Sequence, residues 1–300
     1  MKACGILDLI GNTPLICLDK FSKGTVFAKA EFLNPGGSIK DRIAKSMIED
    51  AEARGVLKPG GTIIEATSGN TGIGLSFVGV RKGYRVVIVM PENMSIERKK
   101  VIAAFGGECY FTPAEESLDG CLRKVAELHE SIPGSWVANQ FENPANIQIH
   151  CETTGPEIWD QMNGQVDSFV AGVGSGGTLA GVGKFLKEKN PNVRIVAVEP
   201  KNVSALLGDE PGLHQIQGIG DGFIPSVLDV SIINHVVEVT DAEAVEMTRE
   251  VTKRCGLLVG TSAGANIYAA LKEAAFLGPK ARVATVLPDR AERYFSTALL

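Results

Sequence analysis

Short apolar runs rich in β-branched residues alternate with longer stretches of helical periodicity along almost the whole chain. The apolar runs predict strands at residues 25–30, 62–66, 85–90, 108–111, 168–172, 194–199, 235–239 and 282–287. The periodic stretches predict helices at residues 38–54, 70–82, 95–105, 116–131, 178–189, 241–255 and 262–277. Because strand, helix and strand in this order form a βαβ unit, the alternation predicts an α/β fold with mostly parallel sheets. In such folds, ligands bind beyond the carboxyl ends of the strands.

The length of 300 residues allows about two domains, since a domain commonly holds ~150 residues. A weak break in the pattern lies near Asn143 and Pro144, before a long segment at residues 145–162. We therefore expect a second sheet after this break.

Charge and composition argue against several classes of protein. The 30 basic and 35 acidic residues leave a formal net charge of −5, whereas proteins that bind nucleic acid usually present a basic face. No apolar run approaches the ~18 residues of a membrane span, and the N-terminus lacks the pattern of a signal peptide. Neither the six cysteines nor the four histidines have the spacing of a metal site. We therefore expect a cytoplasmic protein without a metal, a nucleic-acid partner or a membrane partner.

Three loops rich in glycine and hydroxyl residues each follow a predicted strand and precede a predicted helix. They are Thr-Ser-Gly-Asn-Thr-Gly at 67–72, Gly-Ser-Gly-Gly-Thr at 174–178 and Gly-Thr-Ser-Ala-Gly-Ala at 260–265. Backbone N–H groups at the start of a helix lack intrahelical partners, and the helix dipole favours an anion there. One such loop is equally consistent with a simple tight turn, but three of them with hydroxyl donors favour anion binding.

One of these loops also matches a dinucleotide-binding pattern. Residues 172–177 fit G-x-G-x-x-G, and Glu199 ends the following strand near the offset of a ribose-binding acid. This match makes a nicotinamide-dependent dehydrogenase an alternative. The Gly-Gly-Thr ending, however, adds a hydroxyl at the helix start and fits a compact phosphate better than a pyrophosphate.

Lys40 is a candidate nucleophile. It follows the turn at residues 35–37 and Ser38, a residue type that can cap the helix predicted to begin there. A lysine at this end of a helix faces the positive end of the helix dipole, which lowers its pKa. A lowered pKa is what a lysine needs to form an imine, although most lysines are solvated surface residues.

Taken together, the motifs resemble those of a known family. Pro-Gly-Gly-Ser-Ile-Lys-Asp-Arg and the three glycine loops occur in the family's order, and residues 10–15, 94–98, 140–144 and 292–297 add further matches. They are similar to pyridoxal-phosphate enzymes of the cysteine synthase (O-acetylserine sulfhydrylase) and cystathionine β-synthase group, of fold type II. The resemblance covers essentially the whole chain and overrides the dinucleotide interpretation.

The resemblance implies two open, mostly parallel α/β domains, similar to the tryptophan synthase β subunit, with pyridoxal 5′-phosphate in the cleft between them. Residues 1–33 and 144–300 would form the large cofactor-binding domain. Residues 34–143 would form the small mobile domain that binds the substrate carboxylate.

The resemblance also implies a role for each matching residue. Lys40 would form the imine with the cofactor and move the proton at Cα, Asn70 would hydrogen-bond the 3′ oxygen, and Ser262 would face the pyridine nitrogen. The phosphate would be held by Gly174, Ser175, Gly176, Gly177 and Thr178. The substrate carboxylate would be held by Thr67, Ser68, Gly69, Asn70, Thr71 and Gln140.

The implied reaction is β-replacement at Cβ of a serine- or cysteine-type amino acid through an aminoacrylate intermediate. In the family's commonest form, O-acetylserine and sulfide give L-cysteine and acetate. The family is usually homodimeric, and some members bind the C-terminal tail of serine acetyltransferase, so both partners are expectations.

A threonine-type dehydratase and a binding protein that has lost its chemistry are alternatives. The motifs at 94–98 and 140–144 disfavour the first, and the retained Lys40 disfavours the second.

Two residues depart from the family pattern. Ser175 stands where threonine is usual and keeps the hydroxyl.

Asp221 stands where alanine is usual, in the stretch at 218–225 that resembles a segment beside the cofactor. A carboxylate in a partly desolvated cleft has a raised pKa, which suits a general base or acid. Asp221 would then activate water or protonate a leaving thiolate, so that L-cysteine and water give L-serine and hydrogen sulfide. In the competing interpretation, Asp221 points to solvent and the enzyme is an ordinary cysteine synthase.

Overall fold

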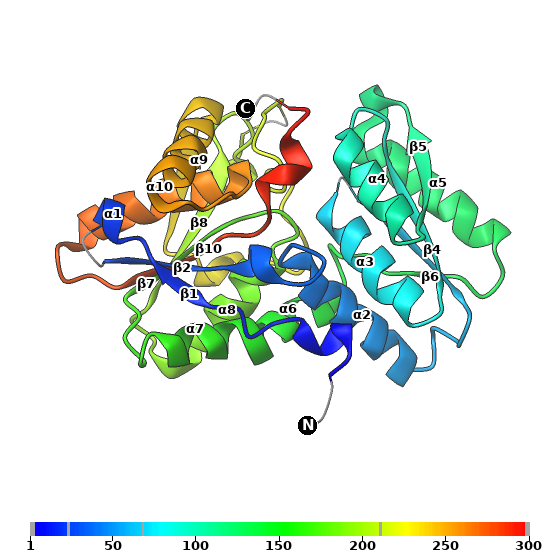
Figure 1. Cartoon of the computed structure of the whole chain (residues 1–300), viewed down its shortest axis with the longest axis horizontal. Helices are drawn as coiled ribbons and strands as arrows, with labels where there is room; N and C mark the ends of the chain where they lie inside the picture. The colour runs from blue at the N-terminus through cyan, green and yellow to red at the C-terminus, as the bar shows by residue number, and fades with distance from the viewer. Residues whose placement is uncertain (1–3, 23–24, 68, 210–211, 298–300) are drawn as a thin grey trace.

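Two sheets organise the chain in the computed structural model, which describes residues 4–22, 25–67, 69–209 and 212–297 (Figure 1). In the described residues, the larger sheet has six strands in the order β1-β2-β10-β7-β8-β9, and the smaller has four in the order β5-β4-β3-β6. Strand β1 runs antiparallel to β2, and every other pair of neighbouring strands in these two sheets is parallel. The predicted α/β class with mostly parallel sheets is confirmed.

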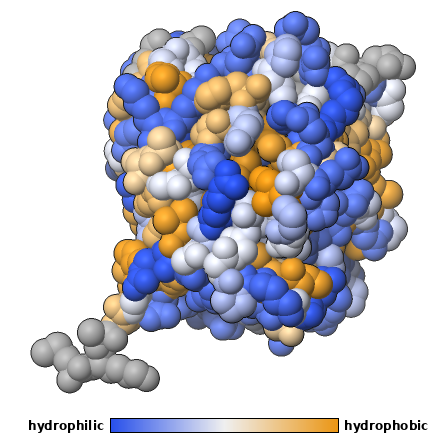
Figure 2. All heavy atoms as spheres, turned by 90° about the vertical axis from the view of Figure 1, so that its right-hand side faces the viewer, coloured by the Kyte–Doolittle hydropathy of each residue, from blue (hydrophilic) through white to orange (hydrophobic). Residues whose placement is uncertain are grey.

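The small sheet is covered by helices on both faces. Its strands are β3 (Thr62–Ala66), β4 (Arg85–Pro91), β5 (Glu108–Thr112) and β6 (Trp136–Val137), and its helices are α2 (Lys40–Ala53), α3 (Asn70–Arg81), α4 (Ile96–Ala104) and α5 (Ser117–Ser131). Alternate residues of a strand point to opposite faces. Ile63 therefore packs in the core beneath α2 and α3, whereas Ile64 packs in the core beneath α5. Hydrophilic residues are interspersed with hydrophobic patches on the outer face of this part (Figure 2).

The large sheet is covered in the same way. Its strands are β1 (Leu15–Cys17), β2 (Val26–Lys29), β7 (Ser168–Gly172), β8 (Arg194–Pro200), β9 (His235–Val239) and β10 (Val283–Val286). Its covering helices are α6 (Pro144–Ile149), α7 (Gly155–Gln161), α8 (Gly177–Lys189), α9 (Asp241–Cys255) and α10 (Thr261–Leu277), and a short α1 (Asp19–Ser22) follows β1. The apolar core on one face includes residues of α9 and α10, and the core on the other includes residues of α7 and α8. Strands β2 and β10 lie side by side although they come from opposite ends of the chain (Figure 1).

The predicted strands are found with ends that shift by at most one residue, and the predicted helices with ends that shift by at most two. Two short strands, β1 and β6, were not predicted, because three and two residues are too few to show a period. The segment at residues 145–162 is helical, and a π-helical turn (His150–Thr154) joins α6 to α7. No helix in the described part of the chain is long and apolar enough to cross a bilayer.

A buried cluster of charges anchors the beginning of α2 to the large sheet. Arg42 donates to Glu31 at 2.8 Å and to Glu157 at 2.7 Å, and Lys29 pairs with Glu157 at 2.7 Å. Glu31 and Lys29 are fully buried. Burial opposes ionisation of Glu31, but the guanidinium of Arg42 holds the pKa of this carboxyl below its usual value. The ion pairs therefore fix the first turn of α2 in place.

We expect Arg42→Ala to lower the free energy of unfolding by about 3–5 kcal/mol, because it leaves the buried carboxylate of Glu31 without its counter-charge, whereas Glu157 keeps Lys29. The measurement is urea unfolding followed by circular dichroism. The control is Arg54→Ala at the far end of α2, where the exposed pair with Asp50 contributes less than about 1 kcal/mol. Equal effects of the two substitutions would show that the cluster does not anchor the helix.

Candidate active site

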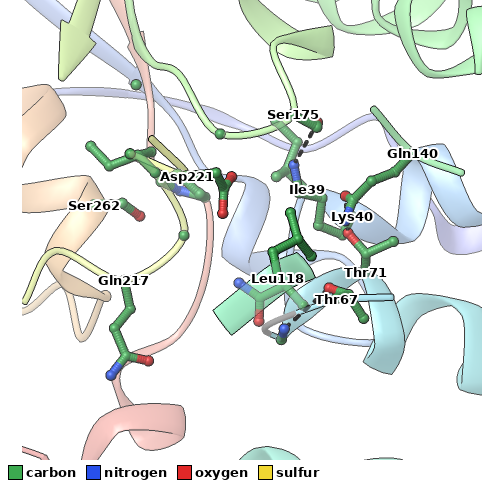
Figure 3. A pocket seen from close by; sticks show the side chains of 18 of the residues that line it. Ile39, Lys40, Thr67, Thr71, Leu118, Gln140, Ser175, Gln217, Asp221 and Ser262 are labelled. Atoms are coloured by element: carbon green, nitrogen blue, oxygen red, sulfur yellow. Dashed lines mark hydrogen bonds between the residues drawn. The ribbon is translucent and has the colours of Figure 1, made fainter. Parts of the chain in front are cut away.

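A cavity of about 450 Å³ is lined by residues from around both sheets, and Figure 3 shows its interior. Its wall includes segments that follow β3, β7 and β10, at the carboxyl ends of parallel strands. The predicted site residues in the wall are Lys40, Thr67, Gly69, Asn70, Thr71, Gln140, Gly174, Ser175, Gly176, Thr178, Asp221 and Ser262. Gly177 is buried next to this wall, and Ser68 lies outside the described residues. The fold thus brings three loops distant in sequence to one cavity.

Lys40 is the first residue of α2, and its Nζ donates to Ser175 Oγ at 3.4 Å. Burial lowers the pKa of the Lys40 amine, and the nearby carboxyls of Asp221 and Asp289 oppose this shift. The direction agrees with the sequence prediction, and the cause found in the structure is burial in the cavity wall. Ser38 is not the N-cap residue of the helix. That position is taken by Ile39, while Ser38 Oγ accepts from the Lys40 backbone N–H at 3.3 Å.

The loop after β3 lies against Gln140. Thr71 Oγ1 donates to Gln140 Oε1 at 2.6 Å. The buried carboxylate of Glu65 accepts the backbone N–H groups of Gln140 at 3.1 Å and of Asn139 at 2.6 Å. Glu65 therefore fixes the backbone at Gln140, and Gln140 in turn contacts the loop.

Asn70 is held by the C-terminal part of the chain. Its Nδ2 donates to Asp289 Oδ2 at 2.6 Å, and its Oδ1 accepts from Arg293. An amide nitrogen carries two hydrogens. One donor of Asn70 thus remains for a ligand in the cavity.

The loop at residues 174–178 forms a cradle at the beginning of α8. Gly176 has a left-handed backbone with φ of +81°, which favours glycine. A Cβ on Gly174 would lie 2.6 Å from the carbonyl oxygen of Gly218, and one on Gly177 would lie 2.5 Å from Asn146 Cγ. Only glycine fits at these two positions. The loop presents free helix N–H groups with the hydroxyls of Ser175 and Thr178, a donor set that fits the phosphate of pyridoxal phosphate.

Asp221 lies in the cavity wall, on a loop where Gly218, Gly220 and Gly222 all have positive φ. The residue is exposed to the open cavity, but the protein groups around it desolvate its carboxyl and raise its pKa, while the nearby Lys40 and His214 lower it. His214 Nε2 donates to the Gly220 carbonyl at 2.9 Å, since its Nδ1 accepts from a backbone N–H at 3.2 Å. His214 thus braces the loop that carries Asp221. Ser262, at the beginning of α10, is buried in the same wall.

Several residues at this site were not predicted from the sequence. Asp289 Oδ2 accepts from Tyr294, the guanidinium of Arg98 lies 4.9 Å from the Tyr294 ring centroid, and Arg98 donates to Gln217. These contacts join α4 of the small sheet to the C-terminal segment. The only sequence signal was the family match at residues 94–98 and 292–297, which assigns no contacts.

Comparisons with known proteins agree on one family. Residues 6–289 match the family described as "Pyridoxal-phosphate dependent enzyme". The chain is 50% identical to a cysteine synthase of Staphylococcus aureus over 298 residues, which covers 98% of this chain and 96% of that protein. Among solved structures, an O-ureido-L-serine synthase superposes with a TM-score of 0.96 at 43% identity, covering 100% of this chain and 95% of that one.

A hydrogen sulfide-producing enzyme from Fusobacterium nucleatum superposes with a TM-score of 0.95 at 41% identity, covering 98% of this chain and 100% of that one. The predicted cofactor, pyridoxal phosphate, is confirmed by the family match. The chain therefore belongs to the family of pyridoxal-phosphate dependent enzymes, in the group of the cysteine synthases and cystathionine β-synthases.

Proposed function

We propose that this enzyme is a cysteine synthase, which makes L-cysteine and acetate from O-acetylserine and sulfide. The observation that supports this most is the arrangement of one cavity. The amine of Lys40 lies 3.4 Å from Ser175 in the glycine cradle, and the wall of the same cavity includes the hydroxyl-rich loop after β3 and Gln140. The 50% identity to cysteine synthases supports the same reaction.

The residues of the cavity divide into those that hold the cofactor and those that hold the substrate. Lys40 would hold the cofactor through Nζ, the loop at 174–178 its phosphate, Ser262 its ring nitrogen and Asn70 its 3′ oxygen. When bound, pyridoxal phosphate supplies an electron sink for charge that develops at the substrate Cα. The neutral hydroxyl of Ser262 leaves the ring nitrogen less protonated than a carboxylate would, which favours loss of the β-substituent over transamination.

Substrate binding and proton transfer fall to the remaining groups. The loop at 67–71 and Gln140 would bind the substrate carboxylate with hydroxyl, amide and backbone donors. Lys40, once released by the substrate amine, would take the proton from Cα. Its lowered pKa raises the fraction of neutral amine, the form that can accept this proton.

We also propose that residues 34–143 form a mobile small domain and that residues 1–33 with 144–300 form the large one. The division into two sheets supports these boundaries. A carboxylate bound between Thr71 and the large domain would draw the two parts together and exclude water from the cavity. The homodimer and the serine acetyltransferase tail stay predictions.

Lys40→Ala should remove the visible absorbance of the lysine-bound cofactor and lower cysteine synthesis by at least ~10²–10⁴-fold, because both the attachment point and the proton carrier are lost. Absorbance spectra, and borohydride reduction followed by peptide mapping, test the attachment. Lys45→Ala, on the same helix, is the matched control and should keep both signals. Modification at a lysine other than Lys40 would overturn the assignment.

A second function is favoured by one observation, the carboxyl of Asp221 in the cavity wall. We propose that Asp221 enables the enzyme to convert L-cysteine and water into L-serine and hydrogen sulfide. The Cβ–S bond breaks, the departing thiolate takes a proton from Asp221, and water adds its oxygen to Cβ while returning a proton to the carboxylate. The similarity to a hydrogen sulfide-producing enzyme supports this alternative.

Asp221→Ala separates the two functions. If Asp221 protonates the thiolate, sulfide release from L-cysteine should fall by ~10²–10⁴-fold, while synthesis from O-acetylserine and sulfide should stay within a few-fold of the original rate. Serine, cysteine and sulfide yields measure both reactions, with the exposed Asp160→Ala as control. Undiminished sulfide release in Asp221→Ala would eliminate the alternative.

The pH dependence of sulfide release gives an independent test. The surrounding protein desolvates the Asp221 carboxyl and raises its pKa, and the proton donor is the protonated carboxyl. Sulfide release should therefore decline as pH rises through this raised pKa, and Asp221→Asn, which cannot titrate, should lack the decline. The measurement is kcat/KM for L-cysteine between pH 5 and 9 at intervals of ~0.5. If kcat/KM declines identically in Asp221→Asn, another group causes the decline. This result would contradict the role of Asp221 as the proton donor.

A further inference from the structure

The buried side chains of Asn146 and His150 contact the glycine cradle at residues 174–178. Asn146 lies on α6, and His150 begins the π-helical turn that follows it. Asn146 Nδ2 lies 3.1 Å from Ser175 Oγ, and His150 Nε2 lies 3.2 Å from Thr178 Oγ1. Both side chains are completely buried. Residues one helical turn apart thus contact the two hydroxyl residues of the cradle.

Close packing holds this arrangement together. A Cβ on Gly181 of α8 would lie 2.7 Å from His150 Cβ and 2.9 Å from the backbone nitrogen of Cys151. Gly177 has equally little room beside Asn146. Because only glycine permits α8 to lie this close, the side chains of Asn146 and His150 pack directly against the cradle.

The donor and acceptor roles at Ser175 follow from its neighbours. Asn146 Nδ2 also donates to the backbone carbonyl of Gln140 at 2.8 Å, and a carbonyl can only accept. This contact fixes the orientation of the Asn146 amide, so Nδ2 must donate to Ser175 Oγ. Lys40 donates to the same oxygen. Because Ser175 Oγ accepts both of these hydrogen bonds, the hydrogen of its hydroxyl remains available for donation.

The role of His150 depends on its tautomer. Burial, together with the charges of Arg42 and Lys40, holds the pKa of His150 well below its usual value, so the ring is neutral and one nitrogen donates while the other accepts. Nδ1 lies 2.8 Å from Thr154 Oγ1. With the hydrogen on Nε2, the ring donates to Thr178 and accepts from Thr154. With the hydrogen on Nδ1, the Thr178 hydroxyl must donate its own hydrogen to Nε2 of the ring.

We propose that Asn146 and His150, the latter as the Nε2–H tautomer, are positioning residues that turn the hydroxyls of Ser175 and Thr178 into donors for the cofactor phosphate. A phosphate dianion only accepts hydrogen bonds, so this polarity is the one that stabilises it. The inference rests on the proposed assignment of residues 174–178 as the phosphate loop. It extends that assignment to residues that do not touch the phosphate themselves.

The test compares the affinity of the full-length, cofactor-stripped chain for pyridoxal phosphate and for pyridoxal, which lacks the phosphate. Asn146→Ala and His150→Leu should lose roughly ten- to hundredfold in affinity for pyridoxal phosphate, the loss expected when a hydrogen bond to a charged group is removed. Their affinity for pyridoxal should change by less than about threefold. Absorbance of the lysine-bound cofactor measures both affinities.

Three further variants separate positioning from a structural effect. His150→Gln retains a donor and an acceptor at similar places and should restore most of the affinity for pyridoxal phosphate. In a Thr178→Val background, His150→Leu should cause no further loss, because its target hydroxyl is gone. Gln148→Ala, exposed on the same segment, should bind both compounds like the original chain.

Two results would overturn the inference: equal losses for pyridoxal phosphate and pyridoxal, or additive losses in the Thr178→Val background. A different result identifies failure of the proposed phosphate loop. In that case the unsubstituted chain would bind the two compounds equally well, although Lys40 still carries the cofactor. Thermal melts followed by circular dichroism show whether each variant folds.

Discussion

The buried ion pairs of Arg42 are the constraint on which the rest of the site depends. Arg42 lies two residues after Lys40 in the first turn of α2, and it joins Glu31 before the helix to Glu157 on α7. Charges without access to water must be paired, because an unpaired buried charge costs several kcal/mol. The pairing therefore leaves the first turn of α2 little freedom. It places the amine of Lys40 against the loop at the beginning of α8.

Close approach of backbones is the second requirement of the site. Gly174, Gly177 and Gly181 each lie where a Cβ would collide with a neighbouring segment. The absence of side chains on Gly177 and Gly181 lets α6 and the π-helical turn after it approach α8 closely, and Gly174 leaves room for the backbone of Gly218. As a consequence, Asn146 Nδ2 and His150 Nε2 lie within hydrogen-bond distance of the loop, whose hydroxyls compensate these two nitrogens for lost water.

The cavity also explains why one family supports several reactions. Lys40, the glycine cradle and the loop at 67–71 would hold the parts that every amino-acid substrate and the cofactor share. Elsewhere in the wall, Asp221 is the residue that we propose to set the choice of reaction, because a carboxyl can transfer a proton. The similar proteins include a cysteine synthase and a hydrogen sulfide-producing enzyme, so overall similarity does not choose between these reactions.

Local sequence determined the longer strands and helices of this protein, because a period of two or 3.6 residues is a property of neighbouring positions. It also singled out Lys40 and the three glycine loops, since the start of a helix and a tight turn each require particular residue types. The resemblance, rather than the periodicity, supplied the roles of Ser262 and Gln140. Only the tertiary structure decided which distant groups meet: Asn70 with Asp289, Asn146 with Ser175, and His150 with Thr178. Such contacts depend on how helices and loops pack across many residues of separation, and no pattern of adjacent residues records that packing.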